Sequence, residues 1–251
     1  MPYRTVINGY GKARVSSPII PVPFGTGRKG VDRILDVGRG RNIFIASSSL
    51  SDKEAMIDWI LKAVLEHSKF EPVKFLFSSF YSSVLRKYEK EPHLLVPVIR
   101  SEREALRALD YIYDENSRRQ QLFAKTKTNW IIDYNDRPGF SDQLPFIIYV
   151  IDEVAPLMKD FKADFCRKVQ QVAMAGRFTG VFLLFATSEV TSEVVRESLV
   201  KSFPTRIACR MERVWQNKLV LGYESEVNLK EGQCLLRESH DDEPKRIKLV
   251  G

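Results

Sequence analysis

Short, uninterrupted apolar runs alternate with longer amphipathic segments along this chain. The run Phe146–Ile151 contains no polar residue, which is typical of a strand buried on both faces of a parallel sheet. Further strands are predicted at 41–46, 73–77, 181–186 and 206–210, with a closing hairpin at 233–236 and 245–250. Helices are predicted at 52–67, 101–123 and 161–175. This alternation predicts an α/β fold with a mainly parallel, doubly wound sheet flanked by helices.

Three further segments have no clear helix or strand pattern. Residues 25–30 have the spacing GxGxxG, which in some folds opens a phosphate-binding turn. The preceding SPIIPVPF contains three prolines and is a poor central strand, so we predict a simple turn at 25–30. Residues 94–98 form a short apolar segment, and residues 129–144 are predicted to be a loop.

Residues 1–41 differ from the rest of the chain in composition. They hold seven of the thirteen glycines, and their eight basic and two acidic residues supply +6 of the total net charge of +7. We therefore predict two parts: a basic, Gly- and Pro-rich leader with a hairpin at 1–41, and one α/β domain at 42–251. A leader of this charge suits contact with double-stranded DNA, and a solvated arm is the alternative.

The overall composition excludes several classes of protein. Apolar residues make up 44% of the chain and charged residues 28%, which indicates a globular protein. No apolar run reaches the roughly 18 residues of a membrane span, and the first residues contain no apolar core of a secretory signal. The cysteines at 166, 209 and 234 lie far apart, which suits a reducing cytosol and provides no metal cluster. We expect a cytoplasmic location, with any membrane attachment supplied by another segment or a partner.

The first candidate chemistry lies at the end of the central apolar run. Asp152 and Glu153 follow Ile151 directly. Ligands of open α/β sheets bind outside the carboxyl ends of the strands, so two adjacent acids there suit a metal–nucleotide site. One carboxylate would hold Mg²⁺ and the next would polarise an attacking water. An ordinary strand end with two solvated acids is the alternative.

Several longer segments resemble one family in their order and spacing. They are PHLLVPVI at 92–99, LPFIIYVIDEVAPLM at 144–158, RFTGVFLLFATS at 177–188, SFPTRIACR at 202–210 and EGQCLL at 231–236. From about Gly40 onward the chain resembles the RecA-like motor domain of the FtsK/SpoIIIE DNA translocases. The resemblance implies a P-loop NTPase fold, a hexameric ring, hydrolysis of ATP with Mg²⁺, and transport of double-stranded DNA. Related domains occur in conjugation and type VII secretion ATPases.

The chain departs from the family at the phosphate-binding loop. The family's GxxxxGK[ST] is replaced by SSSLSDKE at 47–54, in which only Lys53 remains and Glu54 replaces the hydroxyl residue that ligates Mg²⁺. Ser51 and Glu54 have the spacing of a capping box, and Asp52 would add a second carboxylate at the helix start. We therefore expect lost or much weakened binding of ATP and Mg²⁺, with Lys53 a solvated first-turn lysine rather than a phosphate ligand.

The resemblance also implies roles for residues outside this loop. Asp152 would hold Mg²⁺, Glu153 would orient water, and Ser188 stands at the position of the family's sensor glutamine. Arg177, Arg206 and Arg210 match arginines of the family. For Arg206 and Arg210, bracing of the strand against nearby acids and a role at a subunit interface both stay open, whereas for Arg177 we favour a structural role.

Three hypotheses about function follow. In the first, the chain is a pseudo-ATPase, a structural or regulatory subunit in a homo-oligomeric ring or beside an active ATPase partner. In the second, it is an active translocase of double-stranded DNA whose phosphate loop is altered. In the third, it is a DNA-binding or secretion-complex module that uses its basic leader.

Overall fold

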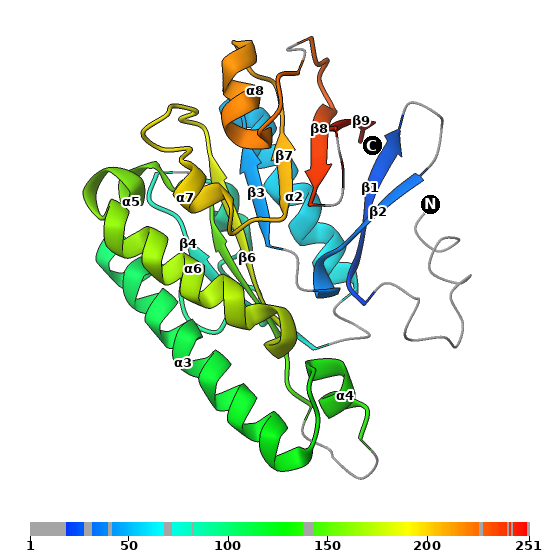
Figure 1. The fold of residues 1–251 in the computed structure, drawn as a ribbon, viewed down its shortest axis with the longest axis vertical. Helices are drawn as coiled ribbons and strands as arrows, with labels where there is room; N and C mark the ends of the chain where they lie inside the picture. The colour runs from blue at the N-terminus through cyan, green and yellow to red at the C-terminus, as the bar shows by residue number, and fades with distance from the viewer. Residues whose placement is uncertain are drawn as a thin grey trace.

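The computed structural model describes residues 19–27, 32–39, 42–67, 72–81, 83–137, 143–225, 228–239, 241 and 243–249. Within these ranges the strands form a single nine-stranded sheet with the order β2-β1-β9-β8-β7-β3-β6-β5-β4 (Figure 1). The basic residues at 4, 12, 14, 28, 29 and 41, and residues 28–30 of the GxGxxG segment, lie outside the described residues.

One half of the sheet is parallel and carries the predicted α/β alternation. It comprises β7 (Thr205–Ala208), β3 (Ile43–Ala46), β6 (Val181–Thr187), β5 (Phe146–Ile151) and β4 (Val73–Ser78). The long helices are α2 (Leu50–His67), α3 (Glu102–Thr126) and α6 (Lys162–Thr179). The predicted fold class is confirmed, because parallel strands need crossover connections and these helices provide them.

The other half of the sheet is antiparallel. It comprises β1 (Pro21–Gly27), β2 (Asp32–Asp36), β8 (Gln233–Glu238) and β9 (Lys245–Lys248), so the closing hairpin forms where it was predicted. The interpretation of SPIIPVPF as a poor central strand was wrong, because Pro21–Gly27 form β1, which lies between β2 and β9. Of the turn predicted at 25–30, residues 25–27 belong to β1 and residues 28–30 lie outside the described residues. The prolines are tolerated there since β9 pairs only with Thr26 and Gly27, beyond the prolines.

The remaining elements are short. They are η1 (Val37–Arg39), η2 (Val84–Tyr88), α4 (Ile131–Asn135), α5 (Ala155–Asp160), α7 (Glu197–Val200) and α8 (Val214–Leu221). The predicted loop at 129–144 contains α4, so this prediction was wrong for five residues. The apolar segment at 94–98 forms no strand, and this part of the chain instead touches β4 through the isolated bridges Phe75–Leu94 and Ser78–Ile99.

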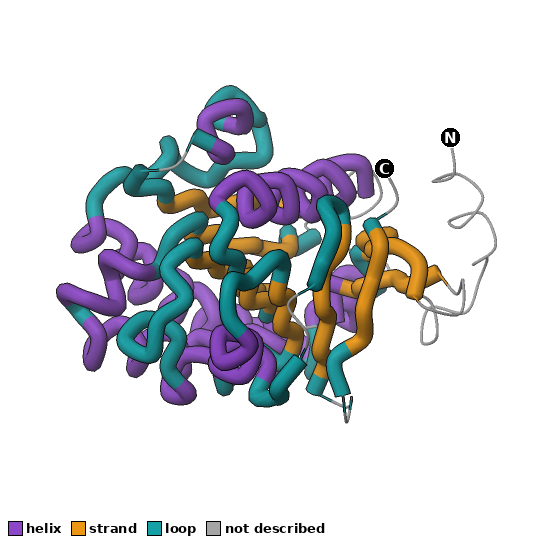
Figure 2. Tube along the Cα trace, turned by 90° about the horizontal axis from the view of Figure 1, so that it is seen from above, coloured by secondary structure: helices purple, strands orange, loops and turns teal. Residues whose placement is uncertain are grey.

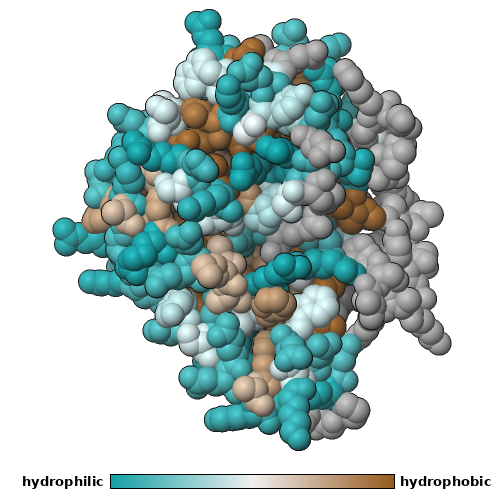
Figure 3. All heavy atoms as spheres, in the orientation of Figure 1, coloured by the Kyte–Doolittle hydropathy of each residue, from teal (hydrophilic) through white to brown (hydrophobic). Residues whose placement is uncertain are grey.

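Two hydrophobic cores lie on opposite faces of the sheet. On β5, Phe146, Ile148 and Val150 belong to the core beneath α2, whereas Ile147 and Tyr149 belong to the core beneath α3 and α6. Figure 2 shows the strands enclosed by helices on both sides. The face drawn in Figure 3 is largely hydrophilic, with a group of apolar atoms in its upper part and smaller apolar areas elsewhere. None of the described helices has the length and apolar content of a membrane span.

A buried arginine on α3 connects this helix to the residue before β5 and to the end of α6. Arg119 of α3 is 1% exposed and donates to Glu115 at 2.7 Å. Its guanidinium also donates to the carbonyl oxygens of Pro145 and Thr179, both at 2.8 Å. Arg119 therefore holds α3, the residue before β5 and the end of α6 together.

Replacement of Arg119 by Met is expected to lower the free energy of unfolding by about 3 kcal/mol, because it leaves two carbonyls without their donor and Glu115 without its buried counter-ion. Arg118 provides the matched control. It binds the same carboxylate of Glu115 at 2.6 Å, but its side chain is 56% exposed. Arg118→Met should cost less than about 1 kcal/mol. Urea denaturation measures both changes, and equal losses would contradict the assigned role of Arg119.

Candidate functional site

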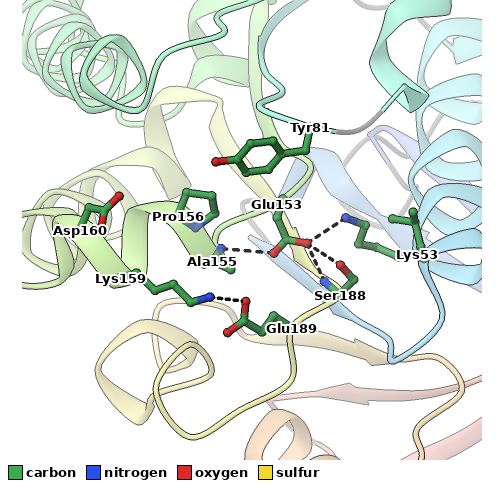
Figure 4. Close-up of a pocket in the computed structure, with 10 residues that line it drawn as sticks. Lys53, Tyr81, Glu153, Ala155, Pro156, Lys159, Asp160, Ser188 and Glu189 are labelled. Carbon is green, nitrogen blue, oxygen red and sulfur yellow. Dashed lines mark hydrogen bonds and ion pairs between the residues drawn. The ribbon is translucent and has the colours of Figure 1, made fainter.

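The candidate site lies at the carboxyl ends of four neighbouring parallel strands. Ser47 follows β3, Ser79 follows β4, Asp152 and Glu153 follow β5, and Ser188 follows β6. A pocket of about 400 Å³ opens at this edge, and Lys53, Glu153 and Ser188 are among the residues that line it. Figure 4 shows these side chains converging on the floor of the pocket. This is the position at which open α/β sheets bind their ligands.

The carboxylate of Glu153 is the centre of this site. It is 8% exposed and accepts five hydrogen bonds. Oε1 accepts from the hydroxyl of Thr187 at 2.6 Å and the N–H of Ala155 at 3.2 Å. Oε2 accepts from the N–H and the hydroxyl of Ser188, at 2.9 and 2.7 Å, and from Nζ of Lys53 at 3.1 Å. Both oxygens are therefore engaged by the protein itself.

Lys53 differs most from its predicted state. It was expected to be solvated, but its side chain is 1% exposed. The ammonium group donates to Glu153 and, at 2.7 Å, to the backbone carbonyl of Asp152. A buried ammonium requires such partners, because burying an unpaired charge is very unfavourable. Lys53 is therefore an internal counter-ion of the acid that follows β5.

This arrangement favours the ionised form of Glu153. Burial alone would raise the pKa of its carboxyl group, but the charge of Lys53 and the donors of Thr187 and Ser188 outweigh burial and hold the pKa below its usual value. Glu153 is therefore an anion at neutral pH whose lone pairs already have partners.

Asp152 lies deeper than Glu153. Its side chain is fully buried, and Oδ2 accepts a hydrogen bond from the hydroxyl of Ser79 at 2.5 Å. Because Ser79 follows β4, this bond joins the ends of two adjacent strands. Asp152 thus has the position predicted for the metal-binding acid, although the described residues contain no cluster of three or more His, Cys, Asp or Glu side chains placed to hold a metal ion.

The loop between β3 and α2 is short and internally bonded. It consists of Ser47, Ser48 and Ser49, because α2 begins at Leu50. The three N–H groups donate to the carbonyl of Thr187 at 3.2 Å, to that of Arg210 at 2.9 Å and to the hydroxyl of Ser47 at 3.1 Å. The donors that would surround a phosphate group therefore already have acceptors within the protein.

The predicted capping box at Ser51 was wrong. Since α2 begins at Leu50, Ser51 lies within the first turn, where it is exposed and its hydroxyl bonds with that of Ser49 at 3.0 Å. Ser49 caps the helix instead: its hydroxyl accepts from the N–H of Asp52 at 3.4 Å and its carbonyl from the N–H of Lys53 at 3.1 Å. Glu54 lies half-buried in the next part of the helix.

The three predicted arginines lie in different places, and none lines the pocket. Arg210 makes a two-pronged ion pair with Asp52, with Nη2 at 2.7 Å from Oδ1, and so holds the start of α2 against the end of β7. Arg177 is exposed in the last turn of α6, with its guanidinium carbon 5.7 Å from the ring centre of Phe178. Ser188, in contrast, is in the site as predicted.

Arg206 lies on the antiparallel side of β7, directly opposite Arg237 of β8. Arg206 donates to the carbonyls of Phe203 and Val220, and Arg237 donates to that of Leu221, so both guanidinium groups meet the carboxyl end of α8. Burial and the charge of Arg237 lower the pKa of Arg206. The negative end of the helix dipole offsets this repulsion.

Sequence reasoning missed the residues that form the walls of the pocket. Tyr81 comes from the segment after β4, whereas Pro156, Lys159 and Asp160 come from α5. Lys159 pairs with Glu189, the residue after Ser188, at 2.6 Å. The one available signal was position, because each of these residues follows shortly after the carboxyl end of a parallel strand.

These residues do not fit a bound Mg·ATP. A triphosphate needs free backbone donors, a lysine that reaches it and a hydroxyl on the metal. The loop donors are satisfied internally, Lys53 is held by Glu153, and Glu54 replaces the hydroxyl residue. In addition, α2 begins three residues before Lys53, at positions where the resemblance implies an open loop.

Removal of the Ser49 hydroxyl is expected to lower the free energy of unfolding by about 1 kcal/mol, the usual value for loss of a helix cap. The neighbouring exposed Ser51 is the matched control, and Ser51→Ala should change stability by no more than a few tenths of a kcal/mol. Thermal denaturation of Ser49→Ala and Ser51→Ala compares them. A larger loss in Ser51→Ala would restore the capping box that the sequence suggested.

Replacement of Lys53 by Met is expected to cost about 3 kcal/mol near pH 7, because the buried carboxylate of Glu153 loses its counter-ion. In the wild-type protein the stability due to the lowered pKa of Glu153 is present above the unfolded pKa and is lost as the pH falls through the folded pKa. In the variant that pKa rises above its unfolded value, so the defect should shrink as the pH is lowered toward about 4.

Denaturation of both proteins across this pH range measures the difference. The double variant Lys53→Met with Glu153→Gln is the control, because it removes both charges together and should recover part of the stability. A defect in Lys53→Met that is independent of pH would show that poorer packing, rather than the ion pair, is responsible.

Comparison with known proteins identifies relatives that cover most of the chain. The DNA translocase FtsK of Streptococcus pneumoniae (strain ATCC BAA-255 / R6) is 26% identical over 237 residues, which is 91% of this chain and 31% of that protein. The chain therefore spans about a third of the length of the curated relatives it matches.

Solved structures share the fold. The pCW3 conjugation coupling protein TcpA, in its monomer form with ATPgS, is similar with a TM-score of 0.77 and 22% identity over 96% of this chain and 68% of that chain. The cytoplasmic domain of the Thermomonospora curvata type VII secretion ATPase EccC gives a TM-score of 0.75 and 22% identity, covering 92% of this chain and 28% of that chain. These likenesses show the RecA-like P-loop NTPase fold.

The family itself follows from the sequence. The sequence profile of the FtsK/SpoIIIE family matches residues 8–140, more than half of the chain. This chain therefore belongs to the FtsK/SpoIIIE family.

Proposed function

We propose that this chain is a pseudo-ATPase: an FtsK/SpoIIIE-type domain of a DNA-translocation or secretion machine that has lost ATP hydrolysis and acts as a structural or regulatory subunit. The observation that carries the proposal is the pairing of Lys53 with Glu153 and with the carbonyl of Asp152. The lysine that should bind phosphate and the acid that should orient water neutralise each other inside the protein.

The surrounding groups support the same conclusion. Glu153 could accept a proton from water only after losing donors from Lys53, Thr187 or Ser188. Each hydrogen bond to a charged group contributes roughly 1.5–3 kcal/mol, so breaking several of them would raise the barrier considerably. Release of Lys53 toward a phosphate would in turn leave Glu153 buried without its counter-ion.

An active translocase with an altered phosphate loop is the second candidate. It is favoured by the retention of Lys53 and Glu153 in one pocket, with Asp152 buried directly behind them, in the positions that the family resemblance implies. In this case the first turn of α2 would have to unwind, since it occupies the place of the loop. The ion pair between Asp52 and Arg210 opposes this unwinding.

The partners that we propose are suggested by the names of the relatives, which describe a DNA translocase, a conjugation coupling protein and a type VII secretion ATPase. We propose that this chain works in the cytoplasm, in a homo-oligomeric ring or beside an active ATPase, with double-stranded DNA as the first partner to test. The basic residues of 1–41 remain the proposed DNA contact, and the division at residue 41 remains a proposal, since β1 and β2 extend the same sheet.

Calorimetric titration with Mg·ATP, combined with a hydrolysis assay in the presence of duplex DNA, tests the proposed function. We expect no binding heat up to millimolar nucleotide and no hydrolysis above that of Glu153→Gln. The titration should be repeated at protein concentrations that permit a ring to assemble, because a neighbouring subunit could complete the site. Micromolar binding that Lys53→Ala abolishes would overturn the proposal in favour of the active translocase.

Substitution of Arg4, Lys12 and Arg14 by Gln tests the DNA contact. Deletion of 1–41 is unsuitable because it would also remove β1, β2 and their buried Val22, Phe24 and Leu35. We expect weaker duplex binding and a flatter dependence on salt, by about 0.9 in the logarithmic slope for each phosphate group that the protein no longer neutralises. The control carries the same charge change on exposed residues of α3, namely Arg103, Arg107 and Lys125. Equal slopes in both triple variants would exclude residues 4–14 as the contact.

A further inference from the structure

A second pocket lies between α6 and the segment that joins α7 to β7. It has a volume of about 340 Å³. Its lining residues are Gln170, Ala173 and Met174 of α6, together with Lys201 and Ser202, which follow α7. Figure 1 shows α7 beside α6, and the two helices are in contact. The pocket thus combines one ammonium group, two neutral polar side chains and an apolar wall.

This pocket is separate from the candidate site at the carboxyl ends of the strands. Ser202 precedes β7, and its carbonyl accepts a hydrogen bond from the amide of Asn42 at 3.1 Å. Asn42 directly precedes β3, so Ser202 lies at the amino ends of two parallel strands. No residue that lines the pocket at Glu153 also lines this one. A ligand bound here would therefore leave the nucleotide position unoccupied.

The hydroxyl of Ser202 is a buried polar group without a partner. The residue is 8% exposed. Its backbone is fully bonded, because its N–H donates to the carbonyl of Leu199 at 3.1 Å and its carbonyl accepts from Asn42. Its Oγ, in contrast, has no hydrogen-bond partner within the described part of the chain. Buried polar groups are normally paired, so this hydroxyl indicates a partner from outside the chain.

The other two polar side chains of the pocket are also available to a ligand. Lys201 and Gln170 are exposed, and among the described residues neither side chain makes a hydrogen bond or an ion pair. Glu197 precedes Lys201 by one helical turn, yet these two side chains form no ion pair in the described structure. The pocket therefore has one positive charge that no carboxylate of the described chain neutralises.

The wall formed by α6 is apolar. Met174 is 77% exposed, a large value for an apolar side chain, and Ala173 lies beside it. An unbranched, flexible thioether adapts its shape to an apolar group that packs on it. A ligand that fits the whole pocket therefore needs an anionic end and a short apolar part.

We propose that this pocket binds a carboxylate that carries a short alkyl chain. A carboxylate has one negative charge and two oxygens that accept hydrogen bonds, which matches one ammonium group and two neutral donors. Lys201, the hydroxyl of Ser202 and the amide of Gln170 would bind the carboxylate, and Met174 would contact the alkyl chain. A cation would be repelled by Lys201, and inorganic phosphate would make no use of the apolar wall.

The test is a titration of the full ¹⁵N-labelled chain at constant ionic strength, followed by the backbone amide resonances of Ala173 and Ser202. Sodium butanoate is the first probe, and butanamide is its neutral isostere. Inorganic phosphate is the probe for a different anion. We expect saturable shifts with butanoate, none with butanamide, and weaker binding of phosphate.

A fourth probe separates the two sources of such a carboxylate. Blocked glutamate, Nα-acetyl-glutamate methylamide, represents an acidic side chain of a polypeptide, whereas butanoate represents a free small acid. Tighter binding of either probe supports the site and identifies its source. Failure of both probes to shift the resonances of Ala173 and Ser202 would overturn the proposal.

Two variants and two matched controls locate the binding. Lys201→Gln should weaken binding of butanoate by about fivefold, the upper range for an exposed ion pair. Ser202→Ala should weaken it by roughly tenfold, as expected for the loss of a hydrogen bond to a charged group. Lys162→Gln and Ser198→Ala change exposed residues of α6 and α7 outside the pocket and should leave binding unchanged. Equal effects of pocket and control variants would contradict the site.

The stability of the protein without ligand provides an independent readout. Because the hydroxyl of Ser202 has no partner in the described chain, Ser202→Ala should leave Tm unchanged or raise it. A purely structural hydroxyl, paired for example with a bound water, would instead give a lower Tm in Ser202→Ala. That result would overturn the assignment of Ser202 to a ligand.

The outcomes are distinguishable from those of the proposed function. The carboxylate site goes beyond the pseudo-ATPase proposal and uses none of the residues around Glu153. Failure of butanoate and blocked glutamate to bind would refute this site and leave the pseudo-ATPase proposal intact. Hydrolysis of Mg·ATP would refute the pseudo-ATPase, whereas saturable binding of butanoate in the same preparation would still support the carboxylate site.

Discussion

The ion pair between Lys53 and Glu153 is the interaction on which the rest of the site depends. It joins the first turn of α2 to the end of β5, with the ammonium almost entirely buried. Because an unpaired charge in this position would be very unfavourable, neither group can leave without the other being compensated. The hydroxyls of Thr187 and Ser188 complete the shell around the carboxylate and bring the end of β6 into the same network. In the proposed pseudo-ATPase, this pairing serves the structure rather than catalysis.

The loop before α2 is bonded in a way that supports the same proposal. Glycines in a phosphate loop keep backbone N–H groups free and allow the chain to bend around a ligand. Here serines supply hydroxyl groups that bond within the loop, and Ser49 starts the helix early. Arg210 then fixes the first turn through Asp52. The acids after β5 stand at this edge of the sheet, whereas the N–H groups of the loop point to acceptors within the protein.

Much of the fold could be predicted from the sequence, because the parallel strands are continuous apolar runs and the long helices are amphipathic. The prediction failed where tertiary contacts override local preference. Pro21 and Pro23 are accepted in β1 since β9 pairs only beyond them, and the start of α2 is set by Ser49 rather than Ser51. The acids of the site were found from their position after an apolar strand. The burial of Lys53 was not predicted, because a sequence does not show which carboxylate a long side chain will reach.

The central claim is that Lys53 stays with Glu153 even when nucleotide is present. A crystal structure of the protein at saturating concentration of a non-hydrolysable Mg·ATP analogue would test it most directly. The account predicts Nζ of Lys53 within hydrogen-bonding distance of Glu153, α2 beginning at Leu50, and no nucleotide between Ser47 and Lys53. A structure in which the first turn of α2 has opened and Lys53 binds a phosphate would contradict it.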